Sequence, residues 1–90
     1  MPFILTRIQG DYDRWKPQFD QDRPGAREAA RGYRVFRSAD DPNEVFILIE
    51  FESDDEARRA QERLLASGVL DRFQDKRGPT IVEVAESVTR

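Results

Sequence analysis

The charged residues that could do chemistry lie on predicted strands and form no catalytic motif. Arg7, Glu50 and Glu83 each fall in a stretch where apolar residues alternate, so each should project from a sheet. If they converge among apolar neighbours, they could hold a small, partly apolar molecule. A carboxylate there would have its pKa raised by burial or lowered by Arg7, and a raised pKa suits a general acid or base. A structural ion pair, or strand ends that reach solvent, is the favoured interpretation.

The composition excludes several kinds of site. The 90 residues contain no histidine and no cysteine, which removes the usual imidazole base, haem ligand, zinc ligands and disulfides. The acidic pairs at 11/13, 40/41 and 54/55 are better explained as helix caps and turns than as metal ligands. We therefore expect no metal and no cofactor.

The stretch Glu44–Glu52 is apolar on both faces of the strand that it predicts, with Phe46 and Leu48 on one side. Four residues on the other side are expected to meet helices: Val45, Ile47, Ile49 and Phe51. An α+β domain covers one sheet face with helices, and this chain has helices enough for only one face. A second copy is expected to cover the other face, which makes the single domain 1–90 a homodimer.

Hydrophobic periodicity predicts the remaining elements. Strands are expected at Phe3–Gln9, Tyr33–Arg37 and Thr80–Glu86 in addition to the central strand. A first helix, capped by Asp11 or Asp13, carries Tyr12, Trp15 and Phe19, and Pro17 either kinks it or marks where regular helix begins. A second helix, with a capping box at Ser53 and Glu56, carries Ala57, Ala60, Leu64 and Leu65.

Shorter signals complete the chain. The breaker Arg23-Pro24-Gly25 places the end of the first helix near Asp22, and a helical piece is expected at Ala26–Arg31. The turn at 40–43 joins two strands in a hairpin. A short helix at Val69–Lys76 is expected to carry Leu70 and Phe73 inward, after which Gly78-Pro79 turns the chain into the last strand.

The element order is the ferredoxin-like βαββαβ arrangement, an α+β fold with a four-stranded antiparallel sheet and both helices on one face. The first strand should lie between the third and fourth, where Arg7 could stand between Glu50 and Glu83. The other face, called the open face here, is expected to carry nine residues: Phe3, Leu5, Arg7, Phe46, Leu48, Glu50, Ile81, Glu83 and Ala85. The second strand adds either Arg34 and Phe36 or Tyr33, Val35 and Arg37. The candidate ligand-binding residues are Arg7, Phe36, Phe46, Leu48, Glu50 and Glu83.

The runs Asp11–Pro17, Gly32–Arg37, Asp41–Val45 and Phe51–Ser53 are similar to small bacterial members of the dimeric α/β-barrel superfamily, and the chain resembles the antibiotic biosynthesis monooxygenase-like domains. The resemblance covers nearly the whole chain. It implies two sheets packed face to face across a twofold axis, with a cavity in each protomer. It also implies a cofactor-independent monooxygenase-like or polyketide cyclase-like enzyme acting on an aromatic or partly apolar substrate.

The resemblance supplies no catalytic residue. Haem-degrading members use a histidine together with an asparagine and a tryptophan, whereas this chain has no histidine, its one tryptophan is Trp15 in the first helix, and its one asparagine is Asn43 in a turn. The alternative to an enzyme is a non-catalytic dimeric binding or accessory protein.

Nucleic-acid and membrane partners are not expected. RNA-recognition motifs share the element order, and Phe46 and Phe51 match two of their aromatic positions, but Glu44 replaces a basic residue and Leu48 the central stacking aromatic. The formal net charge of -3 also disfavours RNA. With no apolar run long enough for a signal peptide or a membrane span, the protein is expected to be cytoplasmic.

Overall fold

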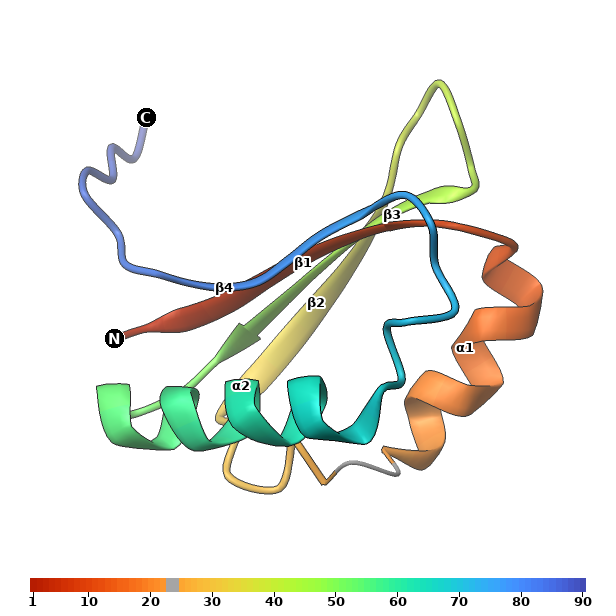
Figure 1. Cartoon of the computed structure of the whole chain (residues 1–90). Coiled ribbons are helices and arrows are strands. Elements are labelled where there is room, and N and C mark those ends of the chain that lie inside the picture. Colours follow the sequence, from red (N-terminus) through yellow and green to blue (C-terminus); the bar gives the residue numbers. More distant parts are fainter. Residues whose placement is uncertain (23–24) are drawn as a thin grey trace.

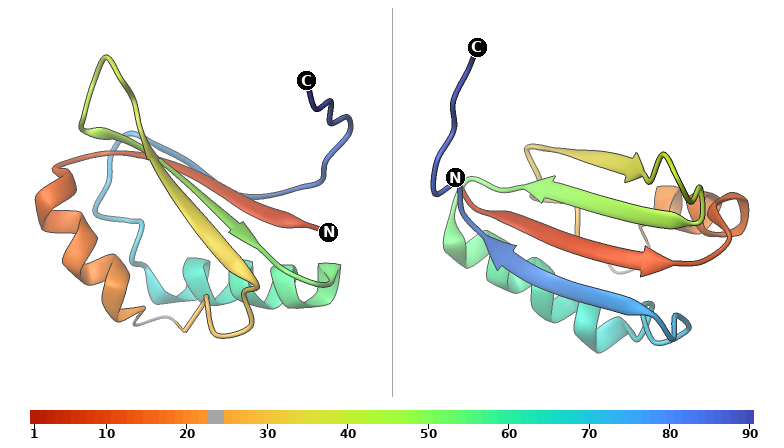
Figure 2. Two further views of the ribbon diagram at one scale, coloured as in Figure 1. Left: turned by 180° about the vertical axis from the view of Figure 1, so that it is seen from behind. Right: turned by 90° about the horizontal axis from the view of Figure 1, so that it is seen from above.

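The computed structural model describes residues 1–22 and 25–90, which form one sheet and two helices in the predicted order (Figure 1). The elements are β1 (Phe3–Gln9), α1 (Tyr12–Gln21), β2 (Gly32–Arg37), β3 (Glu44–Glu50), α2 (Asp54–Ser67) and β4 (Lys76–Val82). The strands are antiparallel in the order β2-β3-β1-β4, so β1 lies between β3 and β4 as predicted. Figure 2 shows both helices on the same side of the sheet. The ferredoxin-like α+β fold is therefore confirmed.

The core lies between the helices and the sheet. Alternate residues of β1 and β3 point into it, and Phe51 follows them just beyond β3. Four side chains are completely or almost completely buried: Ile4, Ile8, Val45 and Phe51. On α2, Ala57 and Ala60 are buried, and their small side chains let the helix approach the sheet closely. Leu65, predicted to be buried, is 61% exposed because it lies about 100° around the helix from Leu64.

The helix caps are as the sequence indicates. The Asp11 carboxylate accepts a hydrogen bond from the Asp13 N–H at 3.1 Å, and the Ser53 hydroxyl accepts one from the Glu56 N–H at 3.2 Å. Each cap satisfies a backbone donor that has no partner inside its helix. Regular helix already begins at Tyr12, so α1 continues through Pro17 rather than starting there.

The predictions of two short helices were wrong. Residues 26–29 and 68–72 form turns, because segments of six and eight residues add too few hydrogen bonds to offset the cost of starting a helix. Phe73 nevertheless points inward and is 8% exposed, as expected. The helix end near Asp22 is confirmed, whereas Arg23 and Pro24 of the breaker lie outside the described residues.

Strand β4 is displaced by four residues from its predicted position. Gly78 and Pro79, expected in a turn, lie inside β4, where the pairing with β1 shifts register between Leu5 and Arg7. An edge strand tolerates a proline, which has no N–H to donate, because it has no second neighbouring strand that would need that hydrogen bond. The pairing register with β1 reverses the expected sides: Ile81 packs against the core, while Val82 lies opposite Phe3 on the open face. Residues 84–90 extend away from the body (Figure 1).

Among the described residues, no helix combines the length and the apolar content needed to cross a membrane.

Candidate functional site

The strand register decides which side chains share the open face. Phe36 lies opposite Phe46, and Arg34 lies opposite Leu48, so the alternative with Arg34 and Phe36 on this face is the correct one. Arg7 is also opposite Phe46, from the β1 side. The register thus brings Arg7, Phe36 and Phe46 into one row across the sheet.

The predicted convergence of Arg7, Glu50 and Glu83 is wrong. Glu50 lies opposite Phe3, four residues along β3 from the partner of Arg7, which is about 13 Å away along the strand. Its nearest described cation is Arg31, with 4.0 Å between Nε and Oε2. Glu83 follows the end of β4 and lines a shallow depression beside α2 together with Arg58. The cause is the displacement of β4, which carries Glu83 past the end of the sheet.

Arg7 has other acidic partners. Its Nε donates to Glu44 at 2.8 Å and its Nη1 to Asp75 at 2.9 Å. The hydrogen bonds with Asp75 and Glu44 raise the pKa of the Arg7 guanidinium above its usual value. Hydrogen bonds from the Gln9 amide and the Asn43 N–H lower the pKa of Asp41 in the same cluster. Arg7 and Asp41 therefore stay charged near neutral pH, and neither is placed to exchange protons with a substrate.

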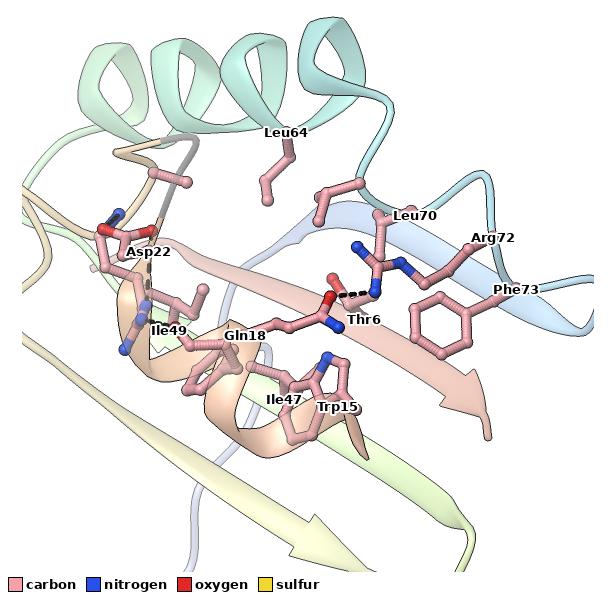
Figure 3. A pocket seen from close by; sticks show the side chains of 14 residues that line it. Thr6, Trp15, Gln18, Asp22, Ile47, Ile49, Leu64, Leu70, Arg72 and Phe73 are labelled. Atoms are coloured by element: carbon pink, nitrogen blue, oxygen red, sulfur yellow. Dashed lines mark hydrogen bonds and ion pairs between the residues drawn. The ribbon is translucent and has the colours of Figure 1, made fainter. Parts of the chain in front are cut away.

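A cavity of about 70 Å³ lies on the opposite side of the sheet, between it, α1, α2 and the turn after α2 (Figure 3). Its walls are apolar and mostly large, and they come from every layer of the fold: Trp15, Phe19, Ile47, Ile49, Leu70 and Phe73. None of the six predicted ligand-binding residues lines it. The spacing of Trp15 predicts a core residue and gives no sign of a cavity; Trp15 is indeed core, at 9% exposed, but it also forms a cavity wall.

A few polar groups also line this cavity. Thr6, which is 4% exposed, rises from β1 at the floor formed by the sheet. The Arg72 guanidinium donates to the Gln18 side-chain carbonyl, which ties the turn after α2 to α1 (Figure 3). These polar groups could orient a ligand that has an oxygen atom.

An ion pair borders the other side of the cavity. Arg27 Nε lies 3.6 Å from Asp22 Oδ1, and the Arg27 N–H donates to Asp22 Oδ2 at 3.1 Å. The Arg27 guanidinium stacks on the Phe19 ring at 3.8 Å and also donates to the Phe19 carbonyl. Asp22 is the one carboxylate among the described lining residues, and it forms an ion pair with Arg27.

The cavity as it stands is smaller than a single-ring organic ligand. Water occupies about 30 Å³ in the liquid, and an apolar cavity of about 150 Å³ accepts benzene. A single-ring molecule would therefore require Leu70 or the Gln18–Arg72 contact to shift. The described residues contain no group of three or more metal-ligating side chains, so the site offers apolar contact and hydrogen bonding.

No protein-family model and no curated protein sequence matches the chain. Solved structures share its fold over nearly the full length. A protein from Deinococcus radiodurans assigned as an antibiotic biosynthesis monooxygenase is 12% identical, with a TM-score of 0.72 over 100% of this chain and 98% of that one. SnoaB, a cofactor-independent oxygenase from Streptomyces nogalater, is 14% identical, with a TM-score of 0.70 over 99% and 97%. Rv0793 from Mycobacterium tuberculosis is 13% identical, with a TM-score of 0.65 over 99% and 100%. The chain thus has the fold of the antibiotic biosynthesis monooxygenase-type proteins, as its sequence resemblance predicts.

Proposed function

We propose that this protein is a homodimer that binds a small, partly apolar organic molecule in the cavity of each protomer and oxygenates it without a cofactor. The observation that carries the proposal is the cavity itself, with aromatic walls from Trp15, Phe19 and Phe73 and a few polar groups. The shared fold with SnoaB, a cofactor-independent oxygenase, supports the choice of reaction.

The proposed reaction needs only the substrate and dioxygen. An activated methylene group loses two hydrogens and gains a carbonyl oxygen, while the second oxygen atom leaves as water, so the substrate supplies all four electrons that reduce dioxygen. The aromatic walls exclude water and hold the ring of the substrate. Thr6 donates a hydrogen bond to the ligand oxygen, and the Arg72 guanidinium stabilises the enolate formed when the substrate loses its proton. Asp22 forms an ion pair with Arg27 and is therefore not free to remove the proton. The site suits a substrate that ionises easily.

The same ion pair favours a second candidate function. With Asp22 engaged and no histidine in the chain, the described cavity residues offer no free base. A protein that binds its ligand without turnover fits this observation.

The open face supports the homodimer. Six apolar side chains gather there: Phe3, Leu5, Phe36, Phe46, Leu48 and Val82. Phe36 is 46% exposed and Leu5 39% exposed in a single chain. A contiguous apolar surface of this kind is typical of a protein interface, and association helps a domain of 90 residues bury enough surface to be stable.

A titration with a six-membered cyclic β-diketone tests the cavity. Trp15 is the one tryptophan, so its indole N–H gives a single NMR signal, which should shift saturably as the ligand enters. Leu64→Phe should abolish the shift by filling the cavity, since Leu64 lines it. Leu65→Phe is the matched control, because Leu65 is the adjacent residue and is 61% exposed.

Oxygen uptake separates the two candidate functions. Stoichiometric uptake with a carbonyl product supports the oxygenase, and an indole shift without uptake supports the binding protein. An indole signal that ligands leave unchanged in the wild type contradicts both.

A further inference from the structure

The charged side chains of the open face are divided between its two ends. The acidic end is defined as Arg7, Asp41, Glu44 and Asp75. The Arg7 guanidinium contacts the carboxylates of Glu44 and Asp75, and the third carboxylate, that of Asp41, accepts a hydrogen bond from Gln9. Arg77 lies opposite Arg7 on the edge strand and adds a second positive charge, but the three carboxylates still outnumber the two guanidinium groups.

At the basic end, defined as Arg31, Arg34 and Glu50, two guanidinium groups line the same depression as one carboxylate, and only Arg31 pairs with it. Arg34 makes no hydrogen bond or ion pair with any residue that the structure describes. The open face therefore has a separation of charge along its strands, with a negative end and a positive end.

The basic end is hollow. A depression of about 290 Å³ lies among Phe3, Gly32, Arg34, Leu48 and Glu50. It exists partly because Gly32 has no side chain, and a Cβ at that position would meet nothing within 4 Å. The hollow has room for an acidic side chain between its two arginines.

A second copy of the chain can supply that side chain. Covering the open face removes Arg34 from water, and a buried guanidinium without a counter-charge is strongly unfavourable. A twofold axis that lies between two stacked sheets and runs across their strands places the acidic end of each sheet over the basic end of the other. Glu44 and Glu50 are at opposite ends of β3, so this axis brings the partner's Glu44 over the hollow.

We propose that Glu44 of each protomer enters the hollow of its partner and pairs with Arg34, which fixes the orientation of the dimer; the inference rests on the homodimer proposed above. Glu44 can serve both partners. Its contacts with Arg7 both use Oε2, at 2.8 Å, so Oε1 is free to accept from the partner's Arg34. The apolar side chains supply the drive to associate, and the two charge pairs select one orientation.

Charge reversal tests the pairing by sedimentation equilibrium. In an Arg34→Glu homodimer both contacts bring two carboxylates together, and in a Glu44→Arg homodimer both bring two guanidinium groups together. Each variant alone should raise the dimer Kd about tenfold or more. In an equimolar mixture, the heterodimer has one restored pair and one native pair, so the mixture should dimerise nearly as tightly as the wild type.

Matched controls separate pairing from general charge effects. Arg59→Glu and Glu62→Arg reverse exposed charges on α2, away from the open face, and should leave the Kd unchanged. If Glu44→Arg fails to fold alone, Arg34→Gln decides: it should weaken the dimer and flatten the dependence of its Kd on sodium chloride.

The outcomes distinguish the two proposals. A wild type that dimerises but is insensitive to both reversals, or a mixture that is no tighter than its components, overturns the pairing and leaves the homodimer standing. A wild type that stays monomeric at all concentrations overturns the homodimer and the pairing together.

Discussion

At the scale of single residues, two hydrogen bonds hold Asp41 at the acidic end of the open face. Its carboxylate accepts from the Gln9 amide at 2.8 Å and from the Asn43 N–H at 3.0 Å, and these bonds lower its pKa from the ordinary value of 3.8. The fold therefore favours the ionised carboxylate. The stability that this adds is fully present above pH 3.8 and is lost as the pH falls through the lower pKa of the folded state.

Asp41→Asn should accordingly lower the melting temperature by a few degrees at pH 7, and the gap to the wild type should shrink below pH 3.8. Thermal unfolding followed by circular dichroism at one protein concentration measures the gap. Asp40→Asn is the control, because only the backbone N–H of Asp40 takes part in a described hydrogen bond. A gap that stays constant across this pH range contradicts the linkage.

At the scale of elements, β4 depends on one glycine. Gly78 has φ +92° and a Cβ there would lie 2.5 Å from the Leu5 carbonyl oxygen, which is backbone and cannot move aside. The glycine thus permits the irregular pairing of β4 with β1. This pairing in turn places Ile81 in the core and Val82 on the open face.

Gly78→Ala should therefore destabilise the protein by about 3 kcal/mol or more, since strained φ and a backbone clash add together. Gly68→Ala provides the comparison. Gly68 also has positive φ, +69°, but the nearest atom to an added Cβ is the movable Asp71 carboxylate, so the loss should be about 1 kcal/mol. Urea denaturation measures both values. Equal losses would mean that the Leu5 contact has no part in β4.

At the scale of the whole molecule, the sheet is apolar on both faces but helices cover only one. The open face carries aromatic side chains on the edge strand β2 as well as in the centre, so association would bury a surface as wide as the sheet. A melting temperature that rises with protein concentration is the expected consequence.

Phe36→Lys should convert the proposed dimer to a monomer while leaving the fold intact. Phe36 lies on the open face of an edge strand and is already 46% exposed, so a lysine costs little within one chain but cannot be buried against a partner. Light scattering after size exclusion measures the mass. Leu65→Lys, on the helix side at 61% exposed, should keep the mass of the wild type. A dimeric Phe36→Lys variant would place the interface elsewhere.

The sequence by itself determined the features that short stretches encode. The alternation of apolar residues in β3 predicted its two faces, Ser53 predicted where α2 begins, and Asp11 or Asp13 where α1 begins, because caps and strand alternation involve neighbours within a few residues. From these elements and the right-handed crossover rule, the ferredoxin-like order of strands followed.

The tertiary structure decided what depends on contacts between distant residues. The register of β4 follows from the approach of Gly78 to Leu5, and it carries Glu83 off the open face. Arg7 binds Asp75, which is 68 residues away, and not Glu50. The cavity is likewise a space left between layers, so its position beside Trp15 emerges only when helices and sheet are packed together.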